Sequence, residues 1–272
     1  MYKLIVSDLD ESLLNDQGEI SPQDVETIQQ LTAAGIKFVP NSGRGFTSMT
    51  GLLKQIGTYG QPNQYVISYN GGVIVDNEHN DVLASHYLDH QIADRLYQLA
   101  RKQPNLGIHV YTLNDVYVSN IDEEEREYIR SRKVIPRELD DPNLDQFVNT
   151  PIVKVIMKNL DQQRLADFRQ LATEQISAPM TIAYSSSRYV EFNPPAIDKG
   201  VASLELGKKL GIAPSEIISI GDNSNDLSMI KAAGMGVCVQ NSVNEIKQAA
   251  NLVLDATNNQ SPITELYQRL FS

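Results

Sequence analysis

The feature that most constrains this chain is a short apolar run, residues 3–7, that ends directly at two aspartates, Asp8 and Asp10. The run predicts a β-strand, and alternate strand residues point to one side, so both carboxylates face one pocket if the extended backbone continues. Neighbouring carboxylates repel each other, and a divalent cation that prefers oxygen ligands, such as Mg²⁺, relieves the repulsion. An exposed acidic turn is the competing interpretation. The position favours a site, because open α/β sheets bind ligands at the carboxyl ends of their strands.

The composition limits the class of protein. With 272 residues and 41% hydrophobic content, the chain can form one large domain or two modest ones. It reaches Asp8 too early for a signal peptide and has no apolar run that could cross a bilayer, so we expect a cytoplasmic protein without a membrane partner. Cys238 is the only cysteine, which excludes an intrachain disulfide and a thiolate metal cluster. The net charge of −11 argues against nucleic acid, but a metal and a few local cations could still hold a small phosphate ester.

A second strand follows the first through a helix. Ser21 and Pro22 are typical of a helix start, Gly35 of a helix end, and residues 36–39 are apolar enough for a strand, so this unit predicts a parallel right-handed crossover. The second strand ends at Asn-Ser-Gly-Arg-Gly, residues 41–45. A hydroxyl and adjoining backbone N–H groups at a strand end can cradle a phosphate. An ordinary glycine turn is the alternative.

The next strand, over residues 65–68, runs into an Asn-Gly-Gly turn that starts at Asn70. This asparagine either lines the site or only makes the turn. From about residue 85 to residue 187 the pattern changes to that of helices packed on a small antiparallel sheet, which predicts an inserted α+β domain. Such a lid excludes water and selects substrates. The acidic run 122–125 is interpreted as a solvated helix start. None of the four histidines has metal-ligand spacing; a structural strand residue is the favoured interpretation of His109, with a substrate contact from the lid as the alternative.

The last third returns to an α/β pattern. A helix begins near Lys199, with Val201, Leu204 and Leu210 expected on its apolar side. A buried-type strand over residues 217–220 then ends at Gly-Asp-Asn-Ser-Asn-Asp, residues 221–226. The two carboxylates and the amides of this junction exceed what a single helix cap requires.

These motifs, in this order, resemble those of the haloacid dehalogenase superfamily, in its Cof-type branch (subfamily IIB). The matching stretches are Asp8-x-Asp10, a strand ending at Ser42 and followed by Gly-Arg, the Asn70-Gly-Gly turn, Lys199-Gly, and Gly221-Asp-x-x-Asn-Asp226. The resemblance implies an α/β fold, with a Rossmann-like parallel-sheet core in residues 1–84 and 188–272 and an α+β cap in residues 85–187.

The resemblance also implies roles for individual residues. Asp8 would be the nucleophile and Asp10 the general acid and base, while Arg44 would contact the substrate or bridge to an acidic neighbour. The phosphate-binding residues would be Ser42, Gly43, Lys199 and Asn225, and the Mg²⁺ site would involve Asp8, the backbone carbonyl of Asp10, Asp222 and Asp226, the last through a water or by orienting Lys199. One departure is Glu11-Ser12, where the family usually has Gly-Thr: Ser12 keeps the hydroxyl, and Glu11 is expected to turn away from the metal.

The function implied is Mg²⁺-dependent hydrolysis of a small phosphate monoester through an aspartyl-phosphate. Sugar phosphates, nucleotides, flavin mononucleotide and pyridoxal phosphate are all compatible substrates, and no oligomeric state is predicted. A phosphotransferase such as a phosphomutase, and a non-catalytic phosphate-binding regulator, are the alternatives.

Overall fold

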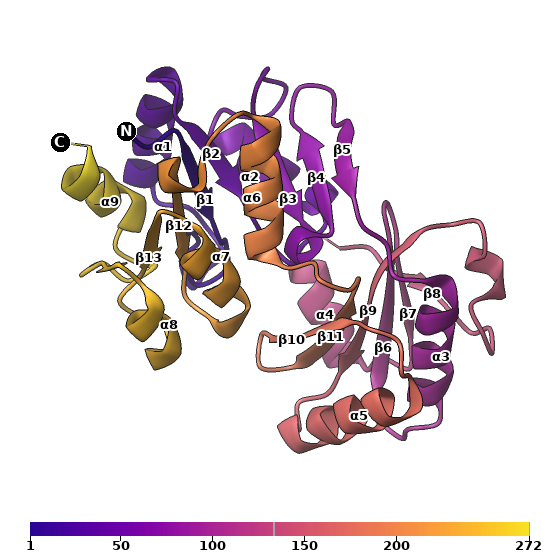
Figure 1. Cartoon of the computed structure of the whole chain (residues 1–272). Coiled ribbons are helices and arrows are strands. Elements are labelled where there is room, and N and C mark those ends of the chain that lie inside the picture. Colours follow the sequence, from indigo (N-terminus) through magenta and orange to yellow (C-terminus); the bar gives the residue numbers. More distant parts are fainter. Residues whose placement is uncertain (133, 272) are drawn as a thin grey trace. The chain divides into compact units, whose positions relative to one another are not determined.

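The computed structural model describes residues 1–132 and 134–271, which divide into two compact units (Figure 1). The first unit comprises Met1–Ser85 and the chain from Asp198 onward, and the second unit is His86–Ile197. Among the described residues, no helix has the length and apolar character that crossing a bilayer requires.

A five-stranded parallel sheet, in the order β14-β13-β12-β1-β2, forms the centre of the first unit. Every residue of β1 is buried, as expected for a parallel strand that is covered on both faces. Because the strands are parallel, their carboxyl ends lie at one edge, which brings the segments after β1, β2 and β12 together. The strands are β1 (Leu4–Ser7), β2 (Lys37–Pro40), β12 (Ile217–Gly221), β13 (Met235–Cys238) and β14 (Leu252–Val253).

The helices of this unit connect and cover the sheet. Ser21 caps the first helix by accepting a hydrogen bond from the N–H of Asp24, and Cys238 is buried, as the sequence predicts. The prediction that Val201 lies on the apolar face of α6 is wrong, because its side chain is 41% exposed. The buried stripe of α6 starts from Lys199 itself, and an apolar pattern cannot reveal a buried lysine. The helices are α1 (Pro22–Ala33), α2 (Thr50–Gln55), α6 (Lys199–Lys209), α7 (Leu227–Ala232), α8 (Asn244–Ala249) and α9 (Pro262–Leu270).

A three-stranded antiparallel sheet of β3 (Tyr65–Ser68), β4 (Val73–Asp76) and β5 (Val82–Ser85) extends this unit. A parallel bridge between Asn41 and Ile67 connects it to the end of β2. The Asn-Gly-Gly turn between β3 and β4 packs against the start of α6. Gly71 has a φ of +100°, and a Cβ there would lie 2.3 Å from the carbonyl oxygen of Asp198, so glycine is required.

The second unit is a six-stranded sheet in the order β10-β11-β9-β6-β7-β8. Its apolar core lies between one sheet face and the helices α3 and α5. The pairs are antiparallel except β7 with β8, which is parallel and was not expected. The elements are α3 (His90–Arg101), β6 (Gly107–Thr112), β7 (Val116–Ser119), α4 (Glu123–Ser131), β8 (Arg137–Glu138), β9 (Ile152–Lys158), α5 (Gln162–Gln175), β10 (Thr181–Ser185) and β11 (Tyr189–Asn193).

Strand β11 lies in this sheet and not in the core, where the expected boundary at residue 188 had put it. It pairs antiparallel with β9 and β10, and Val190 and Phe192 point into the apolar core of the second unit. The sequence pattern of a short strand does not reveal which sheet supplies its partners, and this explains the difference.

Helix α4 packs on the opposite face of the same sheet. It contacts Lys158, Arg188 and Tyr189, among others, and Lys158 and Tyr189 alternate along their strands with residues of the apolar core. Asp122 caps the helix, as expected for an acidic helix start, but the expectation that the whole acidic run is solvated is wrong. Glu125 is completely buried, and it accepts a hydrogen bond from the hydroxyl of Tyr189. The sequence did not reveal this burial, because the two residues are 64 positions apart. His109 is also buried, in β6, beside Glu125.

Candidate active site

The carboxyl end of β1 places Asp8 in a buried position and Asp10 in a half-buried one. The backbone N–H of Asp8 donates to the carbonyl of Ile220 at 2.9 Å, so the parallel pairing of β1 with β12 continues to the first aspartate. This pairing holds Asp8 beside the segment that follows β12.

Lys199, the first residue of α6, brings its ammonium between two carboxylates. Its side chain is fully buried, and Nζ donates to Oδ1 of Asp226 at 2.6 Å and to Oδ1 of Asp8. Asp198 caps the helix by accepting from the N–H of Val201. The cap fixes the start of α6, and so the direction in which the lysine leaves the helix.

The segment after β12 supplies two more carboxylates. Asp222 accepts a hydrogen bond from the hydroxyl of Ser12 at 2.7 Å. The second oxygen of Asp226 accepts the N–H groups of Asp222 and Asn223 at 3.0 and 3.1 Å, so both oxygens of Asp226 are already bonded. Gly221 allows this turn, because a Cβ there would lie 2.5 Å from the Cβ of Asp226.

The charges of this group do not balance. Carboxylate oxygens of Asp8, Asp222 and Asp226 all lie within 4.8 Å of one another, and Lys199 is the ammonium that contacts them. Burial and then the charge of Asp226 raise the pKa of Asp8 to about 7, although Lys199 opposes the shift. Burial and then Asp8 raise the pKa of Asp222 to about 9. Burial alone would lower the pKa of Lys199, but Asp226 and Asp8 outweigh it and raise that pKa.

This group fits a divalent cation. The donors are oxygen atoms only, which suits Mg²⁺, and a bound cation would relieve the repulsion that raises both carboxyl pKa values. Asp8 and Asp222 each use one carboxylate oxygen in the contacts above, whereas Asp226 uses both. We therefore expect Asp8 and Asp222 to supply the direct carboxylate ligands, and Asp226 to orient Lys199.

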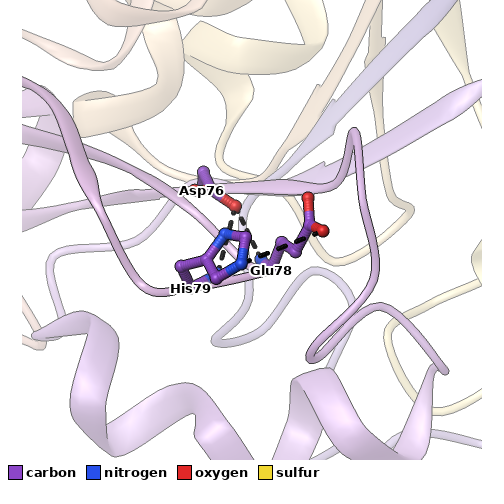
Figure 2. A group of neighbouring side chains, drawn as sticks. All are labelled: Asp76, Glu78 and His79. Atoms are coloured by element: carbon purple, nitrogen blue, oxygen red, sulfur yellow. Dashed lines mark hydrogen bonds and ion pairs between the residues drawn. The ribbon is translucent and has the colours of Figure 1, made fainter.

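A second group of possible ligands, Asp76, Glu78 and His79, lies in the turn between β4 and β5 (Figure 2). Asp76 is half-buried and the other two are exposed. Oδ1 of Asp76 accepts the N–H groups of Glu78 at 2.6 Å and of His79 at 3.4 Å. An aspartate that accepts backbone N–H groups two and three residues on is a common feature of turns, so the turn itself explains these contacts without a metal. The buried group around Asp8 has no such local explanation.

The segment after β2 contributes Ser42 and Arg44. Ser42 is buried, and its Oγ accepts the N–H of Arg44 at 3.2 Å. The guanidinium of Arg44 pairs with both oxygens of Asp10, with Nε at 2.9 Å from Oδ2. Of the two roles considered for Arg44, the structure has the bridge to an acidic neighbour. Gly43 lies against Asn70, since a Cβ on Gly43 would be 3.2 Å from the Asn70 amide oxygen.

The remaining predicted residues are less central. Asn225 is half-buried in the short 3₁₀ turn η5 (Ser224–Asp226) that follows β12. Glu11 is exposed, with a φ of +61°, a backbone conformation that suits the glycine of the family motif. The bond from Ser12 to Asp222 joins positions 210 residues apart, and only the hydroxyl retained at residue 12 hinted at it.

Known proteins resemble this chain over its whole length. A family model described as haloacid dehalogenase-like hydrolase matches residues 5–266. A Haemophilus influenzae protein named "Putative phosphatase" is 30% identical over 271 residues, which cover 100% of this chain and 99% of that protein. A Bacillus subtilis 5-amino-6-(5-phospho-D-ribitylamino)uracil phosphatase is 25% identical, over 93% of this chain and 90% of its own. A crystal structure of a haloacid dehalogenase-like hydrolase from Bacteroides thetaiotaomicron superposes with a TM-score of 0.87 at 30% identity, over 100% of both chains.

Proposed function

The chain belongs to the haloacid dehalogenase-like hydrolase family, and from this premise we propose that it hydrolyses a small phosphate monoester with the aid of Mg²⁺. The observation that carries the proposal is the buried group of Asp8, Asp222, Asp226 and Lys199 at the carboxyl edge of the parallel sheet. A buried group with excess negative charge suits a cation together with the transferring phosphoryl group.

Asp8 is the nucleophile. One of its carboxylate oxygens attacks phosphorus in line, the bond from phosphorus to the ester oxygen breaks, and an aspartyl-phosphate forms. Asp10 donates its proton to the leaving oxygen, then takes a proton from the water that attacks the aspartyl-phosphate and releases phosphate. In this structure the Arg44 guanidinium orients the Asp10 carboxylate through both of its oxygens. One of these two contacts has to open when that oxygen carries the proton.

The phosphoryl oxygens are bound by groups from three segments. These are the Ser42 hydroxyl and the Gly43 N–H after β2, the Lys199 ammonium at the start of α6, and the Asn225 amide after β12. Asp8, the Asp10 carbonyl and Asp222 would hold Mg²⁺, which would neutralise charge on the phosphoryl group. Asp226 keeps the Lys199 ammonium in place.

The second unit acts as a cap that selects the leaving group, and the substrate is a small phosphorylated metabolite. The similarity to a phosphatase of a phosphorylated ribitylamino compound supports this substrate class. Nucleic acid and membrane lipids are not substrates, and the protein is cytoplasmic.

A panel of phosphate esters, assayed with Mg²⁺ and with EDTA, tests the proposal, with Asp8→Asn as the control for contaminating phosphatases. We expect Mg²⁺-dependent release of inorganic phosphate that Asp8→Asn lacks. Product analysis separates hydrolysis from transfer, because a phosphomutase returns a new phosphate ester in place of free phosphate. Phosphate binding without any turnover would instead support a regulator.

A further inference from the structure

We propose that Asn41, a buried residue to which the sequence patterns assign no role, is a positioning residue that fixes the Lys199 ammonium relative to the Ser42 hydroxyl. The inference rests on the proposed function, because it concerns two groups that bind the same phosphoryl unit. Asn41 directly follows β2, and its side chain is completely buried.

The backbone and the side chain of Asn41 join different parts of the site. Its N–H donates to the carbonyl of Ser7 at 2.8 Å, one residue before Asp8. Its Nδ2 donates to the backbone carbonyl of Lys199 at 3.0 Å and lies 3.3 Å from the Ser203 hydroxyl. Ser42 is the next residue in the chain. One residue therefore connects the segments that supply the nucleophile, the phosphate-binding hydroxyl and the lysine.

The hydrogen-bond pattern fixes the orientation of the amide. The Lys199 carbonyl can only accept, and the Ser203 hydroxyl donates its one hydrogen bond to that carbonyl at 2.6 Å, so both groups need a donor from Asn41 and the atom that faces them must be the nitrogen. The amide oxygen then points elsewhere, and it has no hydrogen-bond partner among the described residues.

Stability does not explain an asparagine at this position. The Lys199 carbonyl accepts from the Ser203 hydroxyl, and the helical pattern of α6 also directs the Ser203 N–H toward it, so it is satisfied without Asn41. The amide oxygen, in contrast, is a buried acceptor without a partner, which is unfavourable for folding. A residue that gives little stability and brings an unsatisfied atom is expected where function requires a particular geometry.

The bond from the Asn41 amide ends on the backbone of Lys199, and this position gives it an effect on catalysis. Asn41 holds the backbone of the residue whose ammonium contacts Asp8, so removing the amide lets the start of α6 shift relative to β2. A misplacement of about 1 Å costs roughly 100-fold in rate. A smaller shift should therefore lower kcat by about 10- to 100-fold. It should also weaken the binding of a transition-state mimic, and change KM by less than about threefold.

Asn41→Ala and Asn41→Ser test this, with Ser203→Ala as the matched control. Each Asn41 variant removes the donor that reaches α6, and the serine variant covers the case in which alanine impairs folding. Ser203→Ala removes a buried donor from the same carbonyl and the longer, 3.3 Å contact of Asn41 with the Ser203 hydroxyl, but it leaves the 3.0 Å bond from Asn41 to the Lys199 carbonyl. The measurements are kcat and KM for p-nitrophenyl phosphate, the inhibition constant of orthovanadate, and the unfolding midpoint in urea.

We expect both Asn41 variants to lose kcat, and to bind vanadate more weakly by a similar factor, while their unfolding midpoints stay close to that of Ser203→Ala. Ser203→Ala should keep kcat within about twofold. A merely structural role would lower the unfolding midpoint and leave the vanadate constant of the folded enzyme unchanged. That result, or equal losses in Ser203→Ala, would overturn the inference. A wild-type protein that neither hydrolyses esters nor binds vanadate would instead refute the proposed function, and this inference with it.

Discussion

Each unit has a cluster of charged side chains, and the two clusters differ in how many cations face their carboxylates and in how exposed those carboxylates are. In the first unit, Asp8, Asp222 and Asp226 face the single ammonium of Lys199. In the second unit, the α4 cluster pairs its carboxylates with two cations at short range, and Lys158 lies 2.9 Å from Asp122 and 3.0 Å from Glu124. The α4 cluster consists of Asp122, Glu124, Glu125, Lys158 and Arg188.

The pKa shifts follow this difference. Burial, and after it the neighbouring carboxylates, raise the pKa of Asp8 and of Asp222, and the single ammonium of Lys199 is not enough to cancel these shifts. Hydrogen bonds from Lys158 lower the pKa of Asp122, and those from Arg188 lower the pKa of Glu124. The α4 cluster has two cations for three carboxylates, and the side chains of Asp122 and Glu124 are 63% and 50% exposed, so water screens them and the cluster holds α4 on its sheet. The cluster around Asp8 is buried and has one ammonium for three carboxylates, and this unbalanced cluster is suited to binding a further cation.

The largest expected effect is on the unbalanced cluster. Asp8→Asn keeps the shape of the side chain and removes the nucleophile, so turnover should fall by more than about 10⁴-fold while the protein still folds. Initial rates with Mg²⁺ and a circular-dichroism spectrum of the same sample measure both properties. Substantial Mg²⁺-dependent hydrolysis by verified Asp8→Asn protein would remove Asp8 from the role of nucleophile.

In the α4 cluster, the expected effect is on stability. Arg188→Met leaves the buried carboxylate of Glu125 without its cation, and the free energy of unfolding should fall by about 3 kcal/mol. The control is Arg126→Met, which breaks the exposed pair with Glu138 from the same helix α4 and should cost less than about 1 kcal/mol. Urea unfolding measures both variants. Similar small losses would mean that the α4 cluster is not the anchor of this helix.

The contributions of the two clusters to the free energy of unfolding should also change with pH in opposite directions. The folded-state pKa values of Asp8 and Asp222 are raised to about 7 and about 9, so without metal the folded state keeps protons that the unfolded chain has released. Their contribution to stability is therefore greatest below about pH 4 and is lost as the pH rises through those values. Asp122 and Glu124 have lowered pKa values, so their contribution is present above about pH 4 and is lost as the pH falls below it.

Urea unfolding at pH 5, 7 and 9, in EDTA and in Mg²⁺, measures this slope. The metal-free protein should become less stable from pH 5 to pH 9, and Mg²⁺ should remove most of the loss, because the cation takes the place of the protons. Asp222→Asn should reduce the slope. Equal stability at the three pH values in EDTA would show that burial and mutual repulsion do not raise the pKa values of the carboxylates around Asp8.

The smallest effect concerns Glu11, which lies beside the unbalanced cluster without belonging to it. Its side chain is exposed and its φ is +61°, so Glu11→Gly should stabilise the protein by up to about 1 kcal/mol. Mg²⁺ affinity and turnover should change by less than about tenfold. Glu19→Gly, at an exposed position of the same loop with a negative φ, is the control and should not stabilise. A much larger loss of Mg²⁺ affinity in Glu11→Gly would make Glu11 a ligand.

The sequence predicted the parts of the fold that depend on local pattern and chain order. The strands that end at Asp8, Ser42 and Asp222 were expected, because each apolar run ends at polar residues typical of a site. The parallel sheet then brings these ends to one edge. The haloacid dehalogenase resemblance is confirmed by the family match over residues 5–266.

The contacts made by distant residues could not be predicted. The burial of Glu125, the bond of Asn41 to Lys199 and the sheet to which β11 belongs all depend on partners that only the folded chain brings close. Arg44 was open between two roles for the same reason, since the position of Asp10 relative to the loop after β2 decides between them. The exposure of Val201 follows from a buried lysine, which no apolar pattern reveals.

Trapping the phosphorylated enzyme tests the central claim most directly. Asp10→Asn should slow turnover by roughly 10²- to 10⁴-fold. With p-nitrophenyl phosphate, whose leaving group needs no proton, the first step should suffer less than the hydrolysis of the intermediate, so the aspartyl-phosphate should accumulate. Acid quenching, digestion and mass spectrometry then locate the phosphoryl group. The account predicts one phosphoryl group on the peptide that contains Asp8, and its absence when Mg²⁺ is omitted. Turnover without any adduct, or an adduct on a peptide that lacks Asp8, would contradict it.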